Sequence, residues 1–395
     1  MEKIVVEDVY KVFGPSPKQA IEMLKKGHSK AEILEKTKNT VGVAEASFSV
    51  KEGEILVVMG LSGSGKSTLV RCLNRLIDPT AGKILVDGID ITGLDAEKLR
   101  RFRLDHLSMV FQNFALFPHR TVMDNVAYGL EIKQVAVAKR RERAMEAIVQ
   151  VGLKGNEDSY PSQLSGGMQQ RVGLARALAL DADIMLMDEA FSALDPLIRS
   201  DMQDELLQLQ EKVQKTIVFI SHDLDEALKI GDRIVLMKDG YIVQTGTAEE
   251  ILTNPANEYV AKFVQDVDMA KVITAESVML KPKEMAYYET DGPKSALRKM
   301  KHSHISGIFV RKDKKLMGYV SADDAAEAIK RGDNTLEKVV KTDIETVNFD
   351  TPAVEIIPLL ARLPYPIPVV DEGNRLRGVV IKGSLLAGLA ERGTE

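Results

Sequence analysis

A glycine-rich segment has the residue types and the spacing of a phosphate-binding loop. The apolar run Ile55–Met59 leads into Gly-Leu-Ser-Gly-Ser-Gly-Lys-Ser, and Thr68 then opens a helical pattern. In this strand, loop and helix order, backbone N–H groups wrap phosphates and the helix start adds a favourable dipole. We expect Lys66 to reach the β- and γ-phosphates of a nucleotide and the Ser67 hydroxyl to bind Mg²⁺. The residues of this segment predicted to bind ATP are Gly60, Ser62, Gly63, Ser64, Gly65, Lys66, Ser67 and Thr68.

Two adjacent carboxylates, Asp188 and Glu189, follow the continuous apolar run Ile184–Met187. Such a run is typical of a central parallel strand that is buried on both faces. Carboxylates at the end of a buried strand are unfavourable without a compensating role. We predict that Asp188 orients the Mg²⁺ shell and that Glu189 accepts a proton from the attacking water or polarises it. A pair that only caps the following turn is the alternative.

Residues 164–171, Leu-Ser-Gly-Gly-Met-Gln-Gln-Arg, resemble the signature motif of ABC ATPases. A serine and two glycines ahead of a helix can offer N–H groups to an anion. In that family the signature closes over ATP held by the P-loop of a second subunit, so two sites form only in a head-to-tail dimer. The resemblance therefore implies that a second copy's ATP is contacted by Ser165, Gly166, Gly167 and Gln169.

Further elements of the ABC family follow in the family's order. Gln112 resembles the glutamine that contacts Mg²⁺ and links the ATPase to its transmembrane partner. Residues 192–195 resemble the D-loop, which ends in Asp195, and His222 resembles the switch histidine near the γ-phosphate. The resemblance implies that the catalytic residues are Glu189, His222 and Gln112, and that the Mg²⁺ ligands are Ser67, Gln112 and Asp188.

The N-terminal strands should form one side of the nucleotide site. A first strand is predicted over residues 2–13 and a second over residues 46–50. Residues 15–40 between them read as two short surface helices, the second with Ser29 as its N-cap. Phe13 lies where the family places an aromatic ring that stacks on adenine, and we favour it over the nearby Tyr10.

From Glu54 onward, apolar strand runs alternate with helical patterns, which predicts an α/β fold with a largely parallel sheet. These runs are 55–59, 84–86, 108–111, 184–187, 216–220 and 233–237. Residues 258–267 read as an exit helix, and a connecting segment over residues 266–275 marks the domain boundary.

The C-terminal part contains an internal repeat. Residues 309–320 align without gaps on residues 369–380, a constant offset of 60 residues. Each copy reads as an apolar strand, a charged turn and a second strand with a glycine, flanked by helical stretches. We predict an ATPase domain over residues 1–265 with a helical insertion over 15–40, a first repeat over 276–332 and a second over 336–392.

The resemblance extends over the whole chain to the ATP-binding subunits of glycine betaine/proline betaine importers. It rests on the insertion around residues 27–37, the loop over 59–67 and the segment 187–196, and the repeat resembles a tandem CBS pair. The implied fold is an α/β P-loop NTPase of the ABC ATPase type with a helical signature subdomain, followed by a small α+β tandem CBS domain. The implied activity is ATP hydrolysis that drives osmoprotectant uptake.

The resemblance also implies partners and a location. These are an ATP-dependent dimer of two copies, membrane-spanning permease subunits, and a substrate-binding protein reached through the permease, at the cytoplasmic face of the cell membrane as a peripheral subunit. Three rival interpretations remain: an importer ATPase for another solute such as choline or methionine, a soluble ABC ATPase without a transport role, and a CBS module whose main role is sensing. The complete ATPase motif set argues that sensing is an added role.

The CBS pair is predicted to regulate transport, and its input stays open. Many CBS units hold a ribose with a serine or threonine and an aspartate three residues later. The first copy keeps Ser321 and Asp324, whereas the second reads Ile381-Lys-Gly-Ser384 and has lost both groups. The input is therefore a nucleotide or cyclic dinucleotide at the pair's interface, or ionic strength sensed by surface charges. The charges in question are Arg311, Lys312, Lys314 and Lys315. A pair that only stabilises the dimer is the third alternative.

Composition sets the remaining limits. A chain of 395 residues exceeds what one hydrophobic core usually organises, so two domains are expected. The net charge of -5 argues against nucleic acid as a partner. The single cysteine, Cys72, excludes an intrachain disulfide and fits a reducing, cytosolic compartment. No apolar run approaches the roughly 18 residues of a spanning helix, and no signal peptide is evident, so a membrane role must go through a partner.

Overall fold

The computed structural model describes residues 1–265 and 267–390. The chain forms two compact units that divide after Gln265, and each unit has its own hydrophobic cores. Residue 266 of the predicted connecting segment and residues 391–392 of the predicted second repeat lie outside the described residues. Within the described residues, none of the helices has the length and apolar character that crossing a membrane requires.

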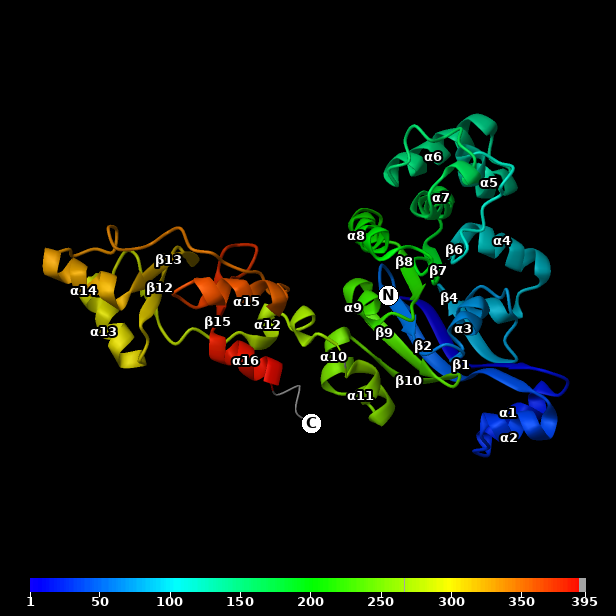
Figure 1. The fold of residues 1–395 in the computed structure, drawn as a ribbon, viewed down its shortest axis with the longest axis horizontal. Helices are drawn as coiled ribbons and strands as arrows, with labels where there is room; N and C mark the ends of the chain where they lie inside the picture. Colours follow the sequence, from blue (N-terminus) through cyan, green and yellow to red (C-terminus); the bar gives the residue numbers. More distant parts are fainter. Residues whose placement is uncertain (266, 391–395) are drawn as a thin grey trace. The chain divides into compact units, whose positions relative to one another are not determined.

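A six-stranded sheet forms the centre of the first unit (Figure 1). Its order is β10-β9-β3-β8-β7-β6, and all neighbours are parallel except β10 and β9. The strands are β3 Ile55–Met59, β6 Leu107–Phe111, β7 Ile184–Asp188, β8 Thr216–Ile220, β9 Arg233–Lys238 and β10 Tyr241–Gly246. Every residue of β3, β7 and β8 is buried, which explains their unbroken apolar runs. The predicted α/β fold is confirmed.

A second sheet is antiparallel, with the order β2-β1-β4-β5. Its strands are β1 Glu2–Phe13, β2 Thr40–Lys51, β4 Ala81–Val86 and β5 Ile89–Asp90. Two expectations differ from this arrangement. The apolar pattern predicts that residues 84–86 join the parallel sheet, but they lie in this antiparallel sheet, because an apolar run predicts a strand and not its partner. The second strand begins at Thr40 rather than Ala46, since it pairs with β1 along its whole length.

The main core joins the two sheets around α3 Lys66–Leu73. Residues from β1, β2 and β4 pack there with residues from β3, β7 and β8. Cys72, the only cysteine in the sequence, is fully buried in this core, and burial raises the pKa of its thiol to about 12. The helix that follows the glycine-rich loop is therefore anchored on both sheets.

Helices cover the sheets and build a separate helical subdomain from α5, α6 and α7 (Figure 1). The helices are α4 Ala96–His106, α5 Val122–Ile132, α6 Val137–Gln150, α7 Gly166–Ala179, α8 Pro196–Val213, α9 Leu224–Ile230, α10 Ala248–Thr253 and α11 Glu258–Val264. The helix predicted over 258–267 is thus too long at its end. Residues 265–281 contain no glycine or proline that would mark the end of this helix in the sequence.

The segment between β1 and β2 forms two short helices, α1 Pro17–Lys25 and α2 Lys30–Thr37, as predicted. Ser29 caps α2 in a capping box with Glu32. The buried residues of these helices pack with residues of β1 and β2 in a small core. The participating residues are Tyr10, Val12, Ala20, Ile21, Leu24, Ile33, Val41 and Ala44.

The second unit uses one hairpin-and-helix arrangement twice. The first copy holds β11 Met285–Tyr287, β12 Gly307–Lys312 and β13 Lys315–Ser321 with α13 Pro293–Ser303 and α14 Ala322–Arg331. The second holds β14 Ile367–Val370 and β15 Leu376–Val380 with α12 Ala275–Val278, α15 Ala353–Arg362 and α16 Lys382–Ala390. Each copy has its own core, and Asn374 joins the two hairpins by hydrogen bonds with the backbone of Leu316.

Candidate functional site

A cavity of about 570 Å³ opens where three parallel strands end. The glycine-rich loop follows β3, Glu189 follows β7, and His222 lies shortly after β8. Because parallel strands bring their carboxyl ends to one edge of a sheet, these segments meet there. The cavity is lined by Phe13, Thr40, Val41, Gly42, Ser62, Gly63, Gly65, Lys66, Ser67, Thr68, Glu189 and His222.

The glycine-rich loop leaves the start of α3 open. Gly65 precedes α3 with φ +104°, and no side chain caps the helix. A β-carbon at Gly65 would lie 2.3 Å from the carbonyl oxygen of Gly42, so only glycine fits this position. The first N–H groups of the helix can therefore bind an anion.

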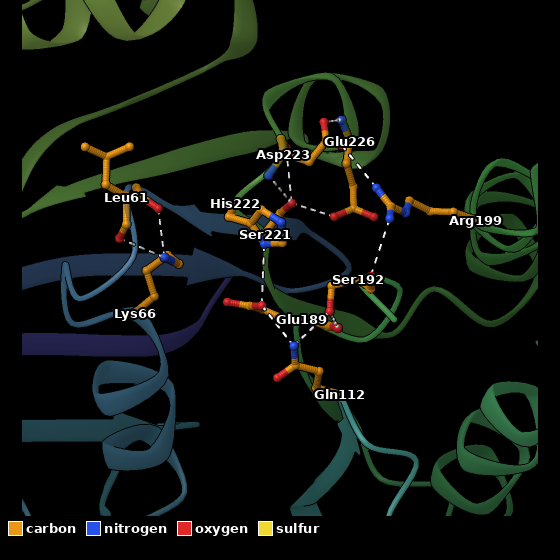
Figure 2. Close-up of polar contacts among 11 residues, drawn as sticks. Leu61, Lys66, Gln112, Glu189, Ser192, Arg199, Ser221, His222, Asp223 and Glu226 are labelled. Atoms are coloured by element: carbon orange, nitrogen blue, oxygen red, sulfur yellow. Dashed lines mark hydrogen bonds and ion pairs between the residues drawn. The ribbon is translucent and has the colours of Figure 1, made fainter. Parts of the chain in front are cut away.

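The Lys66 side chain lies along the same loop (Figure 2). Its Nζ donates to the carbonyl oxygens of Gly60 at 2.7 Å and Leu61 at 3.1 Å. Burial lowers the pKa of Lys66, and this effect outweighs the negative charges of Glu189 and Asp188, which raise that pKa. An arriving phosphate would exchange these carbonyl contacts for a charged partner, which an ammonium group binds more strongly.

Three predicted catalytic residues meet at the edge of the cavity (Figure 2). The Oε2 atom of Glu189 lies 3.4 Å from Nδ1 of His222 and 3.4 Å from Nε2 of Gln112. The backbone of Glu189 has φ +47°, an uncommon value for a residue other than glycine. Such strain persists where the surrounding structure holds it. The Glu189 carboxylate lies toward Gln112 and His222.

Each residue predicted to hold Mg²⁺ can offer an oxygen atom, which this hard cation prefers. Ser67 brings a hydroxyl, and Asp188 brings a carboxylate that Arg71 holds at 3.2 Å. The Gln112 amide donates through Nε2 to Ser192 at 3.1 Å, which leaves its Oε1 atom as the donor suited to a metal. The side chains therefore fit the cation chemically.

A circuit of polar contacts extends from this edge, and the sequence reasoning missed most of it (Figure 2). The Arg199 guanidinium donates to the Leu194 carbonyl at 3.1 Å and pairs with Asp223 at 3.4 Å. Gln112 contacts Ser192, whose carbonyl Arg199 also contacts at 3.4 Å. Because Asp223 adjoins His222, the circuit leads back to Glu189.

A buried carboxylate, Glu226, supports this circuit from α9. It accepts a hydrogen bond from Gln203 at 3.0 Å and another from Ser221. Burial raises the pKa of Glu226. Neither Arg199 nor Glu226 carries a sequence signal, because charged residues in helices are usually solvent-exposed.

The structure separates the two candidates for adenine stacking. Phe13 is 41% exposed and lines the cavity. Tyr10 is buried in the small core with α1 and α2, and its hydroxyl donates to Glu45 at 2.9 Å. Of the two rings, Phe13 is the one that lines the cavity.

The signature residues and Asp195 are not among the residues that line the cavity. Ser165 caps α7, on which Gly166 and Gly167 form the first turn. Gln169 donates to the carbonyl oxygens of Pro161 at 3.1 Å and Leu164 at 3.2 Å, so it holds the loop before α7. Asp195 caps α8 through the N–H of Ile198 at 3.2 Å.

The chain matches two known protein families and has close relatives among characterised transport proteins. The profile of the ABC transporter family matches residues 43–192, and the CBS domain profile matches residues 275–331 and 336–391. The glycine betaine/carnitine transport ATP-binding protein GbuA of Listeria monocytogenes is 54% identical over 99% of this chain and 98% of its own length. The glycine betaine transport ATP-binding protein OpuAA of Bacillus subtilis is 56% identical over 98% of this chain and 92% of its own.

A solved structure resembles part of this chain. It is the dimeric ATP-binding cassette MJ0796 in a post-hydrolysis state bound to ADP and Pi. The likeness has a TM-score of 0.52 at 32% identity and covers 62% of this chain and 98% of that one.

Proposed function

Because this chain belongs to the family of ATP-binding subunits of glycine betaine ABC transporters, we propose how its residues hydrolyse ATP and which solute its transporter carries. The observation that carries the proposal is the cavity that joins the glycine-rich loop, with Lys66, to the edge formed by Glu189, His222 and Gln112. The glycine-rich loop with Lys66 can hold the phosphates of ATP, and the edge with Glu189 can activate water.

Each group around the cavity has a distinct part in the reaction. Lys66 and the N–H groups at the start of α3 bind the β- and γ-phosphates, and Phe13 stacks on adenine. Glu189 accepts the proton of the attacking water, and His222 orients Glu189 and contacts the γ-phosphate. Ser67, Gln112 and Asp188 would hold Mg²⁺, which would supply positive charge beside the phosphates of ATP.

The active unit is a head-to-tail dimer of two copies. Ser165, Gly166 and Gly167 are absent from the cavity of their own chain and are offered to the nucleotide of a second copy. Gln169 hydrogen-bonds to the loop that precedes these three residues. Asp195 is the last residue of the D-loop and caps α8. The related cassette was solved as a dimer, which supports this arrangement. Permease subunits and a substrate-binding protein complete the transporter, with this chain peripheral at the cytoplasmic face of the membrane.

The transported solute is a quaternary-amine osmoprotectant such as glycine betaine. Relatives named for glycine betaine transport match this chain over nearly its whole length, including the CBS pair. Reconstitution with the partner permease in proteoliposomes tests this assignment. Glycine betaine should be taken up in an ATP-dependent manner and should stimulate hydrolysis. Uptake of choline or methionine alone would favour the rival importers, and ATPase activity with no solute effect would favour a soluble role.

The CBS repeats form a regulatory module in residues 276–332 and 336–392, separate from the ATPase domain in residues 1–265. A cavity of about 350 Å³ lies within this second unit, and Lys281, Lys283 and His304 are among its lining residues. Such basic groups suit the phosphates of a nucleotide or cyclic dinucleotide. Ser321 and Asp324 are not among the lining residues, and they contact each other at 2.6 Å while Lys341 holds Asp324 at 2.7 Å. The alternative input is ionic strength, acting on Arg311, Lys312, Lys314 and Lys315.

Truncation after residue 270 is expected to leave ATP hydrolysis intact and to remove regulation. All residues assigned to the reaction lie before this point. The measurement is ATPase activity and salt-dependent uptake of the reconstituted transporter, with and without the truncation. Sensing by exposed charges should fade at high salt, because they are screened within about 8 Å at physiological ionic strength. Unchanged regulation would eliminate the sensing role, and complete loss of hydrolysis would show that the module is structural.

A further inference from the structure

The wall of the cavity formed by Phe13, Thr40, Val41 and Gly42, here called the β1–β2 wall, is held from outside by the helical insertion. Phe13 pairs directly with Thr40 in the sheet, so the insertion leaves and re-enters the fold at the wall itself (Figure 1). A rearrangement of α1 and α2 would therefore move cavity-lining residues.

A buried asparagine joins the two ends of the helical insertion. Asn39 is fully buried. Its Oδ1 accepts the N–H of Ser16 at 3.1 Å, and its Nδ2 donates to the Ser16 carbonyl at 3.1 Å. These two bonds tie the strand ends together directly beside Phe13 and Thr40. Since Asn39 satisfies both groups of one backbone residue, an isosteric change would break one bond and keep the other.

Lys30 contacts the β1–β2 wall directly from the first turn of α2. Its Nζ donates to the carbonyl oxygen of Val41 at 2.8 Å. β2 lies at the edge of its sheet, so its outward backbone groups need partners from elsewhere. The outward N–H of Ala44 donates to the Gly240 carbonyl oxygen at 2.8 Å, and Nζ of Lys30 donates to the Val41 carbonyl oxygen.

The Lys30 side chain also packs against the turn around Gly240, which is hydrogen-bonded to the glycine-rich loop. Gly240, between β9 and β10, has φ +78°, and a β-carbon there would stand 2.6 Å from Nζ of Lys30. The N–H of Gly240 donates to the carbonyl of Ser64 at 2.8 Å. Gly65 of the glycine-rich loop lies close to both Gly42 and Gly240. A β-carbon at Gly65 would lie 2.3 Å from the Gly42 carbonyl oxygen and 3.4 Å from Cα of Gly240. Lys30, the β1–β2 wall and the loop thus form one contiguous set of contacts.

We propose that the helical insertion sets the affinity of the cavity for nucleotide, with Lys30 as the positioning residue that holds the β1–β2 wall against the glycine-rich loop. The inference rests on the proposed ATPase function and assigns a role to a part of the chain that contains none of the reacting groups. Lys30 acts through the Val41 backbone and the Gly240 turn. Loss of its ammonium should loosen the wall on the adenine side and leave Lys66 and Glu189 in place.

The test is Lys30→Met, which keeps most of the side-chain length and removes the donor. The KM for ATP should rise about 3- to 10-fold, the range expected from one lost hydrogen bond, with kcat nearly unchanged. The Kd for ADP should rise by a similar factor, because ADP shares the adenine side. Lys36→Met, at an exposed position of the same helix, is the matched control and should behave as wild type.

Asn39→Asp provides an independent variant. It keeps the acceptor for the Ser16 N–H and replaces the Nδ2 donor by an oxygen that repels the Ser16 carbonyl oxygen. It should raise the KM in the same direction, which keeps the inference testable if Lys30→Met folds poorly. Unchanged KM and Kd in both variants would overturn the inference, and so would a fall in kcat and thermal stability with no change in KM. A wild-type chain that binds no nucleotide would instead overturn the proposed function.

Discussion

Replacement of Glu189 by Gln is expected to slow ATP hydrolysis by about 10²- to 10⁴-fold, or about 2.7 to 5.4 kcal/mol of barrier. The amide keeps the shape of the side chain beside His222 and Gln112 but cannot accept the proton of the attacking water. The groups proposed to bind phosphate are untouched, so ATP should still bind and a dimer with bound nucleotide should accumulate.

Single-turnover hydrolysis and size-exclusion chromatography with ATP measure the two effects of Glu189→Gln. Glu142→Gln, the same chemical change at an exposed position of α6, is the matched control and should retain full activity. Turnover of Glu189→Gln at the wild-type rate would show that another group accepts the proton.

A mixture of two inactive variants is expected to regain activity if the sites are shared between two copies. Lys66→Ala removes the cation proposed to bind phosphate, and Ser165→Arg obstructs the proposed signature contact. In a heterodimer of the two, one composite site receives both changes and the other receives neither. Recovery should reach at most roughly a quarter of wild-type activity, because random pairing makes half of the dimers heterodimers and each keeps one of two sites.

The mixing experiment has an internal control. Lys66→Ala mixed with Glu189→Gln places one defect in each site, because both residues line the same cavity of their own chain and are proposed to act on the nucleotide there. That mixture should stay inactive while the first recovers. No recovery in the first mixture, with exchange of subunits demonstrated by differently tagged chains, would argue that each chain forms its site alone.

The geometry of the candidate site could be predicted where chemistry depends on local sequence. The runs 55–59 and 184–187 are continuous because their strands are buried on both faces, so the residues that follow them had to meet at one sheet edge. The spacing of the glycine-rich loop and its lysine depends on the path of the backbone itself. For this reason Lys66 and Glu189 could be placed near one another before any tertiary contact was known.

Features that depend on distant contacts could not be predicted in the same way. The partner sheet of residues 84–86 follows from pairing with β1, which lies far away in sequence. The circuit through Arg199 and Glu226 consists of charged helical residues whose neighbours come from other elements. The choice between Phe13 and Tyr10 needed the small core around α1 and α2, because the strand pattern alone does not say which ring is covered.

The burial of Cys72 makes the native chain a convenient background for site-specific labelling. The thiol is enclosed between the two sheets, and its raised pKa keeps it protonated at neutral pH, so thiol-reactive dyes should not modify the folded protein. A cysteine introduced at an exposed position, such as Lys139 on α6 or Glu327 on α14, would then be the single labelled site. Fluorescence from such a dye could follow the helical subdomain or the CBS unit without removal of a native residue. Labelling of the unmodified chain would in turn report the opening of the main core.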